Sequence, residues 1–409
     1  MIYDALLLLA FPKIVWDRWK RGRVRPTFAE RLGRFIPDTQ GKPVIWIHAV
    51  SVGEIKSAEP LYQKLKGHYP TSFFLITTTT ATGQDEARRT LSTADAFGFL
   101  PLDFSWITRR WVKALKPTHF ILIESDFWYN LLSTLKQNGT LIILASGKMS
   151  PRSAKRFLFF PYFAKKLFSL FDLLCVQNSE HAARFAPFAQ PIVTGNLKLD
   201  ISPKPVTPPP WKTELYPVTI SCTHDPEEEQ LLLALKPLLP RLQIFLAPRH
   251  PERFSAVEKL LDKLNIPSIR WSQIERKTGQ ENVILIDSMG QLPICYALSH
   301  LAIVAGSFTD KVGGHNLLEP LFYGTPSLFG PHTWTQNEFA KKIIEAQAGL
   351  QLPLSQLASI LEQLMENPDQ LTAMKQAGSV LIESSRGAAE RTFSQLKEKE
   401  FGDKSLSVL

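Results

Sequence analysis

Apolar and polar residues follow each other along the chain in a pattern that predicts repeated strands and helices. From Pro43 onward, short continuous apolar runs are separated by longer amphipathic segments. Continuous runs are typical of strands buried on both faces of a parallel sheet, and the segments between them, such as 54–65 and 84–91, predict crossover helices. The predicted strands are 44–50, 73–77, 119–124, 141–145, 173–176 and 192–194 in the first half, and 218–221, 243–247, 283–287, 301–305 and 327–329 in the second.

A proline-rich stretch divides this pattern into two. Residues 203–210 read PKPVTPPP, and five prolines in eight positions predict a stiff, extended hinge linker. Because 409 residues are too many for one ordinary core, we expect two doubly wound, Rossmann-like α/β domains, at 36–202 and 211–385, with a ligand cleft between them. Residues 386–409 are a C-terminal helix or tail, and periodicity does not decide whether the helical stretch 379–400 packs on the first domain.

The first 35 residues differ from both predicted domains. Apolar residues fill most of positions 2–16, and between Lys13 and Arg34 eight residues are basic and two are acidic. The apolar run is shorter than the ~20 residues that span a bilayer, and its positive charge follows the apolar part, unlike that of a signal peptide. We interpret 1–35 as an interfacial membrane anchor; an amphipathic helix packed on its own domain is the alternative.

Composition narrows the class of protein. A hydrophobic content of 44% and a charged content of 21% are those of a globular chain. Residues 13–34 supply +6 of the net charge of +9, which indicates a membrane surface and not a nucleic-acid partner. Cys175, Cys222 and Cys295 are far apart and form no CxxC pair or Cys/His cluster, so the sequence predicts neither a metal site nor a disulfide framework.

Polar residues follow the predicted strands of the first half. The strand 44–50 leads into Ser51, Gly53 and Glu54. Gly53 permits a tight turn, and Glu54 at the start of the next helix fits either a general base or an acid that complements the helix dipole.

Two further carboxylates follow the strand 119–124. Glu124 ends this strand and Asp126 lies two residues later, beside Phe127, Trp128 and Tyr129. Carboxylates directly after a buried strand are costly without a polar function, so we favour a site in which a sugar stacks on the aromatic rings; a helix cap with the aromatic residues in the core is the alternative. Ser51, Gly53 and Asp126 are candidates for contacts with the acceptor, if the site transfers a sugar to another molecule. Lys198, at the end of the first domain, can meet a phosphate or carboxylate, although a solvated lysine fits equally well.

Three polar clusters follow strands of the second half. Pro248-Arg249 presents an arginine suited to a bidentate grip on phosphate. The turn with Met289, Gly290 and Gln291 lets backbone N–H groups approach a ligand. In the third cluster, Ser307 precedes a glycine pair that would form an anion site at the start of a helix, with an acid one turn later for ribose hydroxyls. Its members are Ser307, Gly313, Gly314, His315, Asn316, Leu317, Leu318 and Glu319. The three clusters describe a sugar-nucleotide site.

Eight motifs in one order resemble the lipid A-specific 3-deoxy-D-manno-octulosonic acid (Kdo) transferases of Gram-negative outer-membrane assembly. The resemblance covers the chain from the N-terminal segment to about residue 391. The motifs are HAVSVGE (48–54), TTTTATG (77–83), ESDFWYN (124–130), GNLKLD (195–200), PRHPERF (248–254), DSMGQL (287–292), GGHNLLEP (313–320) and GPH (330–332).

The resemblance implies the GT-B fold, with the acceptor on the first domain and the donor CMP-Kdo on the second. It implies an inverting, metal-independent transfer of one or more Kdo units, without a cofactor, to the lipid A precursor lipid IVA at the cytoplasmic face of the bacterial inner membrane. Glu54 matches the family's general base, and Glu124 and Lys198 match its transition-state stabilisers. The stretches that match its CMP contacts are Pro248-Arg249, Met289-Gly290-Gln291 and Asn316-Leu317-Leu318-Glu319.

Four stretches depart from the family's usual pattern. The family has a second glutamate and then Leu-Trp-Pro where Asp126 and 127–129 stand, and Asn-Ala-Arg-Leu-Ser where 146–150 stand. It has a Met-Gly-Glu turn where Gln291 removes a charge, and an acidic-Gly pair in place of Asp225-Pro226. These departures concern acceptor geometry and the number of sugars added.

Two other classes share part of the pattern. A UDP-sugar transferase or sugar-nucleotide epimerase would have similar glycine turns and an acid like Glu319, and selective stabilisation by CMP over UDP or UMP separates it from the first class. A non-catalytic, membrane-bound carbohydrate-binding scaffold is the other alternative. Glu54 and Glu124 oppose it, because a scaffold needs no carboxylates at strand ends that face a cleft.

Overall fold

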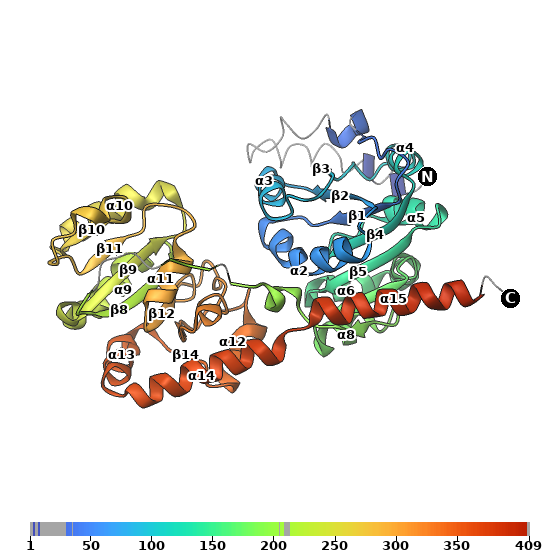
Figure 1. Ribbon diagram of the computed structural model, residues 1–409. Helices are drawn as coiled ribbons and strands as arrows, with labels where there is room; N and C mark the ends of the chain where they lie inside the picture. Colours follow the sequence, from blue (N-terminus) through green and yellow to red (C-terminus); the bar gives the residue numbers. More distant parts are fainter. Residues whose placement is uncertain are drawn as a thin grey trace. The chain divides into compact units, whose positions relative to one another are not determined.

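The computed structural model describes residues 3, 4, 7, 8, 30–34, 36–203, 205–207 and 213–406 (Figure 1). Most of the predicted anchor 1–35, and residues 204 and 208–210 of the predicted linker, lie outside the described residues. The chain divides into two compact units: the first contains Met1–Ile201 and Ser385–Leu409, and the second contains Ser202–Ser384.

The first unit is built on a seven-stranded sheet in which every neighbouring pair of strands is parallel. The order across the sheet is β3-β2-β1-β4-β5-β6-β7, so the direction of winding reverses between β1 and β4. The strands are β1 (Val44–His48), β2 (Phe73–Thr78), β3 (Ala96–Phe99), β4 (Pro117–Ile123), β5 (Leu141–Gly147), β6 (Leu173–Val176) and β7 (Ile192–Val193).

The continuous apolar runs have a direct structural cause. Successive side chains of a strand point to opposite faces, and in β1 Val44 and Trp46 pack in one core cluster while Ile45 and Ile47 pack in another. All four side chains are buried because helices cover both faces of the sheet (Figure 1).

The second unit repeats this plan with its own sheet and core. All its neighbouring strands are parallel, in the order β10-β11-β9-β8-β12-β13-β14, and a reversal lies between β8 and β12. Alternate residues of β9 again enter separate clusters, Ile244 in one and Phe245 in the other. The strands are β8 (Tyr216–Thr223), β9 (Leu242–Pro248), β10 (Ser268–Arg270), β11 (Val283–Leu285), β12 (Leu301–Val304), β13 (Ser327–Phe329) and β14 (Gly349–Gln351).

Helices connect the strands of both sheets. Within the described residues no helix combines the length and the apolar character needed to cross a bilayer. The α-helices are α2 (Val52–His68), α3 (Ala81–Thr90), α4 (Ser105–Leu115), α5 (Tyr129–Gln137), α6 (Pro151–Phe159), α7 (Pro161–Phe168), α8 (Ser179–Phe185), α9 (Glu227–Leu235), α10 (Phe254–Lys263), α11 (Leu292–Leu298), α12 (Asn337–Glu345), α13 (Leu357–Glu366), α14 (Pro368–Ser385) and α15 (Ala388–Leu406). The short helical turns are η1 (Glu30–Arg34), η2 (Leu197–Asp200), η3 (Lys236–Arg241), η4 (Pro251–Arg253), η5 (Trp271–Arg276), η6 (Pro320–Tyr323) and η7 (Leu354–Gln356).

The last helix, α15, belongs to the first unit. Asp200 accepts hydrogen bonds from the backbone N–H groups of Gly387 and Ala389, both at 2.6 Å, and so caps the start of this helix. One turn into α15, Nε of Arg391 donates to the carbonyl of Thr194 at 2.7 Å. The sequence periodicity did not decide where this C-terminal helix packs. In the structure α15 is bound to the stretch 194–200, which follows β7.

Three strands were absent from the sequence prediction, and all three lie at sheet edges. β3 ends one edge of the first sheet, and β10 and β14 are the two edges of the second. Most residues of these three strands are not fully buried, so the strands need no continuous apolar run. The strand β1 is also shorter than the predicted strand 44–50, because it ends at His48.

Candidate active site

The carboxyl edge of the first sheet gathers the predicted acids at its switch point. Glu54 follows β1 and Glu124 follows β4, and these two strands are neighbours at the reversal of the strand order. Ligands of doubly wound sheets bind at such a reversal, because the loops that follow the two strands diverge there.

Glu54 is held in the first turn of α2. Its Oε2 accepts the backbone N–H of Val50 at 2.7 Å, and the hydroxyl of Ser51, the N-cap residue, is 3.4 Å from its Oε1. Gly53 lies in the same turn. The side chain is buried, and this burial together with the neighbouring Glu124 carboxylate raises the pKa of Glu54 to about 7. Glu54 therefore complements the start of its helix and is also suited to take up a proton near neutral pH.

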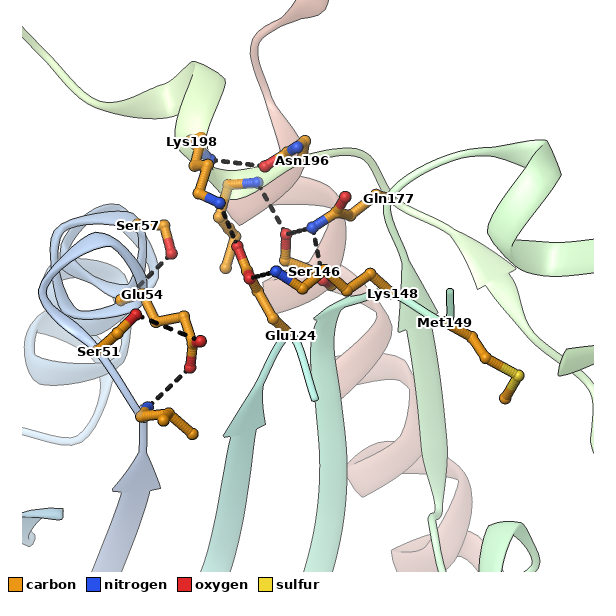
Figure 2. Close-up of polar contacts among 12 residues, drawn as sticks. Ser51, Glu54, Ser57, Glu124, Ser146, Lys148, Met149, Gln177, Asn196 and Lys198 are labelled. Carbon is orange, nitrogen blue, oxygen red and sulfur yellow. Dashed lines mark hydrogen bonds and ion pairs between the residues drawn. The ribbon is translucent and has the colours of Figure 1, made fainter. Parts of the chain in front are cut away.

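Glu124 is fully buried between two lysines. Nζ of Lys198 lies 2.7 Å from its Oε1, and Lys148 donates to its Oε2. Burial alone would raise the pKa of Glu124, but Lys198 and Lys148 outweigh it and lower the pKa below the usual value. Figure 2 shows both lysines directed at the Glu124 carboxylate, with Glu54 in the first turn of the neighbouring α2. Glu124 is thus a fixed negative charge whose oxygens are already paired.

The backbone around Glu124 is strained. Glu124, Asp126 and Ser146 are not glycines, yet their φ values are 61°, 142° and 54°. Such conformations cost of order 1–3 kcal/mol each and persist where the surroundings hold them. Here the hydroxyl of Ser146 accepts the backbone N–H of Leu197 at 3.2 Å and the side-chain N–H of Gln177 at 3.3 Å, which ties the ends of β5, β6 and η2 together.

Asp126 is partly exposed and pairs with a buried histidine. Nε2 of His48, the last residue of β1, lies 3.2 Å from Oδ2 of Asp126, and its Nδ1 lies 2.9 Å from the carbonyl of Thr77. The alternative of a helix cap by Ser125 or Asp126 is wrong, because α5 begins later, after Trp128.

The aromatic residues beside Asp126 do not form the open sugar platform that we expected. Phe127 packs edge-on against Phe168 and Phe185, at 5.1 and 6.2 Å between ring centroids. Trp128 and Tyr129 also pack against this core cluster. Helices α5, α7 and α8 converge on this point, so the three aromatic rings take part in core packing.

In the second unit, two of the three predicted stretches line one pocket. Pro248 and Arg249, after β9, face Met289, Gly290 and Gln291, after β11, across this pocket, which Cys222 and Ser288 also line. Gly290 has a φ of 87°, a conformation that favours glycine. Arg249 is exposed, and its backbone N–H donates to the carbonyl of Thr223 at 3.0 Å, which fixes the position from which its side chain extends.

The third stretch meets the loop after β8 through a pair of histidines. Nε2 of His315 and Nε2 of His224 are 2.7 Å apart, and the two rings are stacked at 5.0 Å. Burial, together with His224 and Arg249, lowers the pKa of His315 to about 4. A buried acid supports the loop that precedes His315, since Glu227 accepts the N–H groups of Gly306 at 2.7 Å and Phe308 at 3.0 Å.

The glycine pair does not form the anion site that we expected at the start of a helix. Residues 313–316 have no regular structure, and the first helical turn is the short η6 (Pro320–Tyr323). A proline cannot continue an α-helix through the preceding turn, so Pro320 prevents one that begins at Asn316. The N–H of Gly314 is not free, because it donates to the carbonyl of Gly306 at 2.7 Å.

Several other predicted donor contacts have internal roles. The buried hydroxyl of Ser307 donates to the carbonyl of Val304 at 2.6 Å and accepts the N–H of Gly330 at 2.8 Å, so it does not fit an anion contact. Leu317 and Leu318 are buried, which leaves only their backbone for a nucleotide. Glu319 is half-buried near Cys222 and Tyr296, and its charge helps to raise the pKa of both groups. Asn316 is exposed.

Sequence reasoning missed three residues that shape these sites. Lys148 stands within the stretch 146–150 that departs from the family pattern, and it is one of the two lysines that pair with Glu124. His224 and Glu227 lie on either side of the departing pair Asp225-Pro226, and no sequence pattern singled them out. The signal for Lys148 is a basic residue three positions after the predicted strand 141–145, at the same sheet edge as Glu124. Among the residues that the structure describes, no three His, Cys, Asp or Glu side chains are close enough to hold a metal ion.

The two doubly wound parallel sheets define a protein of the GT-B fold. The structure resembles a UDP-N-acetylglucosamine 2-epimerase from Listeria monocytogenes with a TM-score of 0.62 and 14% identity, over 89% of this chain and 98% of that one. It also resembles MurG of Acinetobacter baumannii with a TM-score of 0.50 and 12% identity, over 84% and 99% of the two chains. At these identities the likeness shows the fold alone.

The chain belongs to the 3-deoxy-D-manno-octulosonic acid transferase family. A family profile described as "3-Deoxy-D-manno-octulosonic-acid transferase (kdotransferase)" matches residues 26–201. The 3-deoxy-D-manno-octulosonic acid transferase of Chlamydophila psittaci is 31% identical over 97% of this chain and 95% of its own length. That of Haemophilus influenzae is 32% identical over 97% of each. The protein is therefore a glycosyltransferase that transfers Kdo, and the epimerase, UDP-sugar and scaffold alternatives are set aside.

Proposed function

We propose that this enzyme transfers Kdo from CMP-Kdo to lipid IVA, the precursor of lipid A, with inversion and without a metal ion, at the cytoplasmic face of the inner membrane. The observation that carries the proposal is the pairing at the first switch point: a buried acid, Glu54, with a pKa of about 7, beside a glutamate already neutralised by two lysines.

Glu54 is the proposed general base. As an acceptor hydroxyl attacks the sugar carbon, the Glu54 carboxylate takes the hydroxyl proton while the bond from the sugar to CMP breaks. A base with a pKa near the working pH combines a substantial ionised fraction with real basicity, and a positioned base is worth ~10²–10⁴ in rate.

The pairing of Glu124 supports inversion. A retaining reaction of the double-displacement kind needs a second carboxylate free to attack the sugar. Both oxygens of Glu124 are engaged by Lys148 and Lys198, so this carboxylate is not free to form a bond with the sugar carbon. A site in which Glu54 acts as a base on the acceptor, and no second carboxylate bonds to the sugar, fits a single displacement.

The second unit supplies the proposed donor site. Arg249 and the turn 289–291 line one pocket, and the guanidinium would hold the phosphate of CMP as its negative charge grows. Because this charge is met by an arginine, the proposal requires no metal ion. It does require Glu54 of the first unit and Arg249 of the second to reach the same substrate during a turnover. Lipid IVA is favoured as acceptor because the apolar and basic segment 1–35 matches a lipid that carries both acyl chains and phosphates.

The mass of the lipid product tests this proposal. Purified enzyme is incubated with CMP-Kdo and tetra-acylated lipid IVA in detergent, with and without EDTA, and the lipid is analysed by mass spectrometry. We expect one or more Kdo increments, unchanged by EDTA, and none when UDP-N-acetylglucosamine replaces the donor. A lipid of unchanged mass would contradict the donor and acceptor assignment, and loss of product in EDTA would contradict metal independence.

A further inference from the structure

Helices α6 and α7 form an elbow whose tip is apolar and exposed. The elbow, residues 151–168, consists of two helices that each begin with a proline and meet at Phe160. Around this junction the exposed fractions are 55% for Leu158, 77% for Phe159, 62% for Phe160, 84% for Tyr162 and 36% for Phe163. Single exposed apolar residues are ordinary, but five within six positions form a surface that needs a partner.

The charge of the elbow has a single sign. Its five charged side chains are exposed and basic, and residues 151–168 contain no Asp or Glu. The five are Arg152, Lys155, Arg156, Lys165 and Lys166. Aromatic rings bordered by arginine and lysine suit the interface of an anionic bilayer, where the rings enter the headgroup layer and the cations meet lipid phosphates. The same five charges would repel a second copy of this surface.

The elbow is held rigidly on the core of the first unit. Its inner side buries Ala154, Ala164 and Leu167. Phe157 packs on Phe168 with 5.0 Å between ring centroids. The exposed rings are therefore presented by packed helices and are not part of a loose loop.

The start of the predicted membrane anchor lies against the same elbow. The Tyr3 ring stacks on Phe163 with 6.4 Å between centroids and an angle of 16°, and it also contacts Tyr129 at 5.6 Å. Asp4 accepts the backbone N–H of Ser105 at 2.9 Å, at the start of α4. The anchor was inferred from sequence alone, so two features found independently, the apolar and basic segment 1–35 and the elbow, meet at one place.

We propose that the tip of the α6–α7 elbow inserts into the surface of an anionic bilayer and acts as a second membrane contact beside the N-terminal segment. This inference rests on the proposed function, because an enzyme that acts on a lipid has to reach that lipid in its membrane. It assigns the contact to Leu158–Phe163 and the electrostatic attraction to the surrounding lysines and arginines.

A dye at the tip tests insertion directly. The full-length Phe159→Cys variant is labelled with an environment-sensitive thiol dye and mixed with vesicles of phosphatidylcholine and phosphatidylglycerol. Cys175 and Cys295 are buried, and the unsubstituted protein measures labelling of Cys222. Val380→Cys, on α14 and 64% exposed, is the matched control. We expect a blue shift at position 159 and none at 380. An unshifted dye at 159 on protein that sediments with the vesicles would overturn the proposal.

A second variant separates this inference from the proposed function. Phe159→Ser/Phe160→Ser/Tyr162→Ser should bind the anionic vesicles at least tenfold more weakly than the unsubstituted protein, keep its melting temperature, and transfer Kdo normally in detergent. Leu233→Ser/Val380→Ser should change neither binding nor transfer. Unchanged vesicle binding, or an elbow-dependent dimer in sedimentation velocity, would refute the membrane contact while leaving the chemistry intact. Absence of transfer in detergent by the unsubstituted protein would instead refute the proposed function.

Discussion

At the scale of single residues, the fold disfavours the ionised form of Glu54. Its carboxyl group is buried, lies near the charge of Glu124, and accepts a backbone hydrogen bond from Val50 at 2.7 Å. An ionised Glu54 therefore costs stability, and the same environment makes it basic enough to accept a proton. Stability and catalysis oppose each other at this position.

We predict that Glu54→Gln stabilises the protein at alkaline pH. An unfolded glutamate ionises near pH 4.5 and the folded one near 7, so the native state carries no penalty below pH 4.5, a growing penalty between 4.5 and 7, and the full penalty above. The variant should be more stable than the unsubstituted protein by ~1–3 kcal/mol at pH 8, with the difference vanishing toward pH 4.5. Urea unfolding at several pH values measures this, and an equal difference at all pH values would contradict the raised pKa.

Lys148→Met should destabilise the first unit by ~1–2 kcal/mol. It leaves the buried Glu124 carboxylate with Lys198 alone, and the cost is moderated because the Lys148 side chain is partly exposed. Urea unfolding followed through the buried Trp46 and Trp111 detects the change. In Glu124→Gln/Lys148→Met the charge is absent as well, so the loss should be smaller than in the single lysine variant. An equal or larger loss would contradict a role in neutralising Glu124.

The sequence placed Glu54, Glu124, Lys198 and Arg249 at strand ends because each directly follows a recognisable apolar run or a known motif. The structure brings the first three together and places Arg249 beside the turn 289–291. Lys148 and His224 could not be predicted in the same way. Their partners are side chains on neighbouring strands, and which lysine reaches a carboxylate depends on register and rotamer, not on spacing along the chain.

At the scale of elements, burial decided which strands could be read from the sequence. Central strands such as β1 and β9 are covered on both faces and are encoded as unbroken apolar runs. The edge strands β3, β10 and β14 are covered less and carry a weaker signal. The expected helix after the glycine pair failed for a local reason, because Pro320 limits the segment to a short turn.

Asp200→Ala should loosen α15 from the first unit. Two backbone N–H groups at the start of this helix would lose their acceptor, and loss of a helix cap costs ~0.5–2 kcal/mol. Hydrogen exchange should speed up in 387–396 and in the contacting stretch 194–197, while α14 in the second unit keeps its protection. Asp200→Asn retains an acceptor and is the control. Unchanged exchange in α15 would show that packing alone holds the helix.

At the scale of the whole molecule, each unit has its own sheet and its own apolar core. In the proposed function the two units have different roles, because the general base Glu54 lies in one unit and the nucleotide pocket lies in the other. The chain nevertheless passes between the units twice, since α15 returns to the first.

We predict that calorimetry resolves two unfolding transitions and that CMP raises only one of them. A ligand at 100 times its dissociation constant stabilises the state that binds it by ~2.7 kcal/mol. CMP should therefore shift the transition of the second unit, and UMP should shift it less. The Asp200→Ala substitution should lower the other transition. A CMP shift in the transition that Asp200→Ala lowers would contradict the assignment of the nucleotide to the second unit.

The rate of Kdo transfer by Glu54→Gln, measured together with its binding of CMP, tests the central claim most directly. The account predicts a rate ~10²–10⁴ times lower than that of the unsubstituted enzyme at saturating CMP-Kdo, with an unchanged thermal shift by CMP. A variant that transfers Kdo at nearly the normal rate would contradict the assignment of Glu54 as the general base.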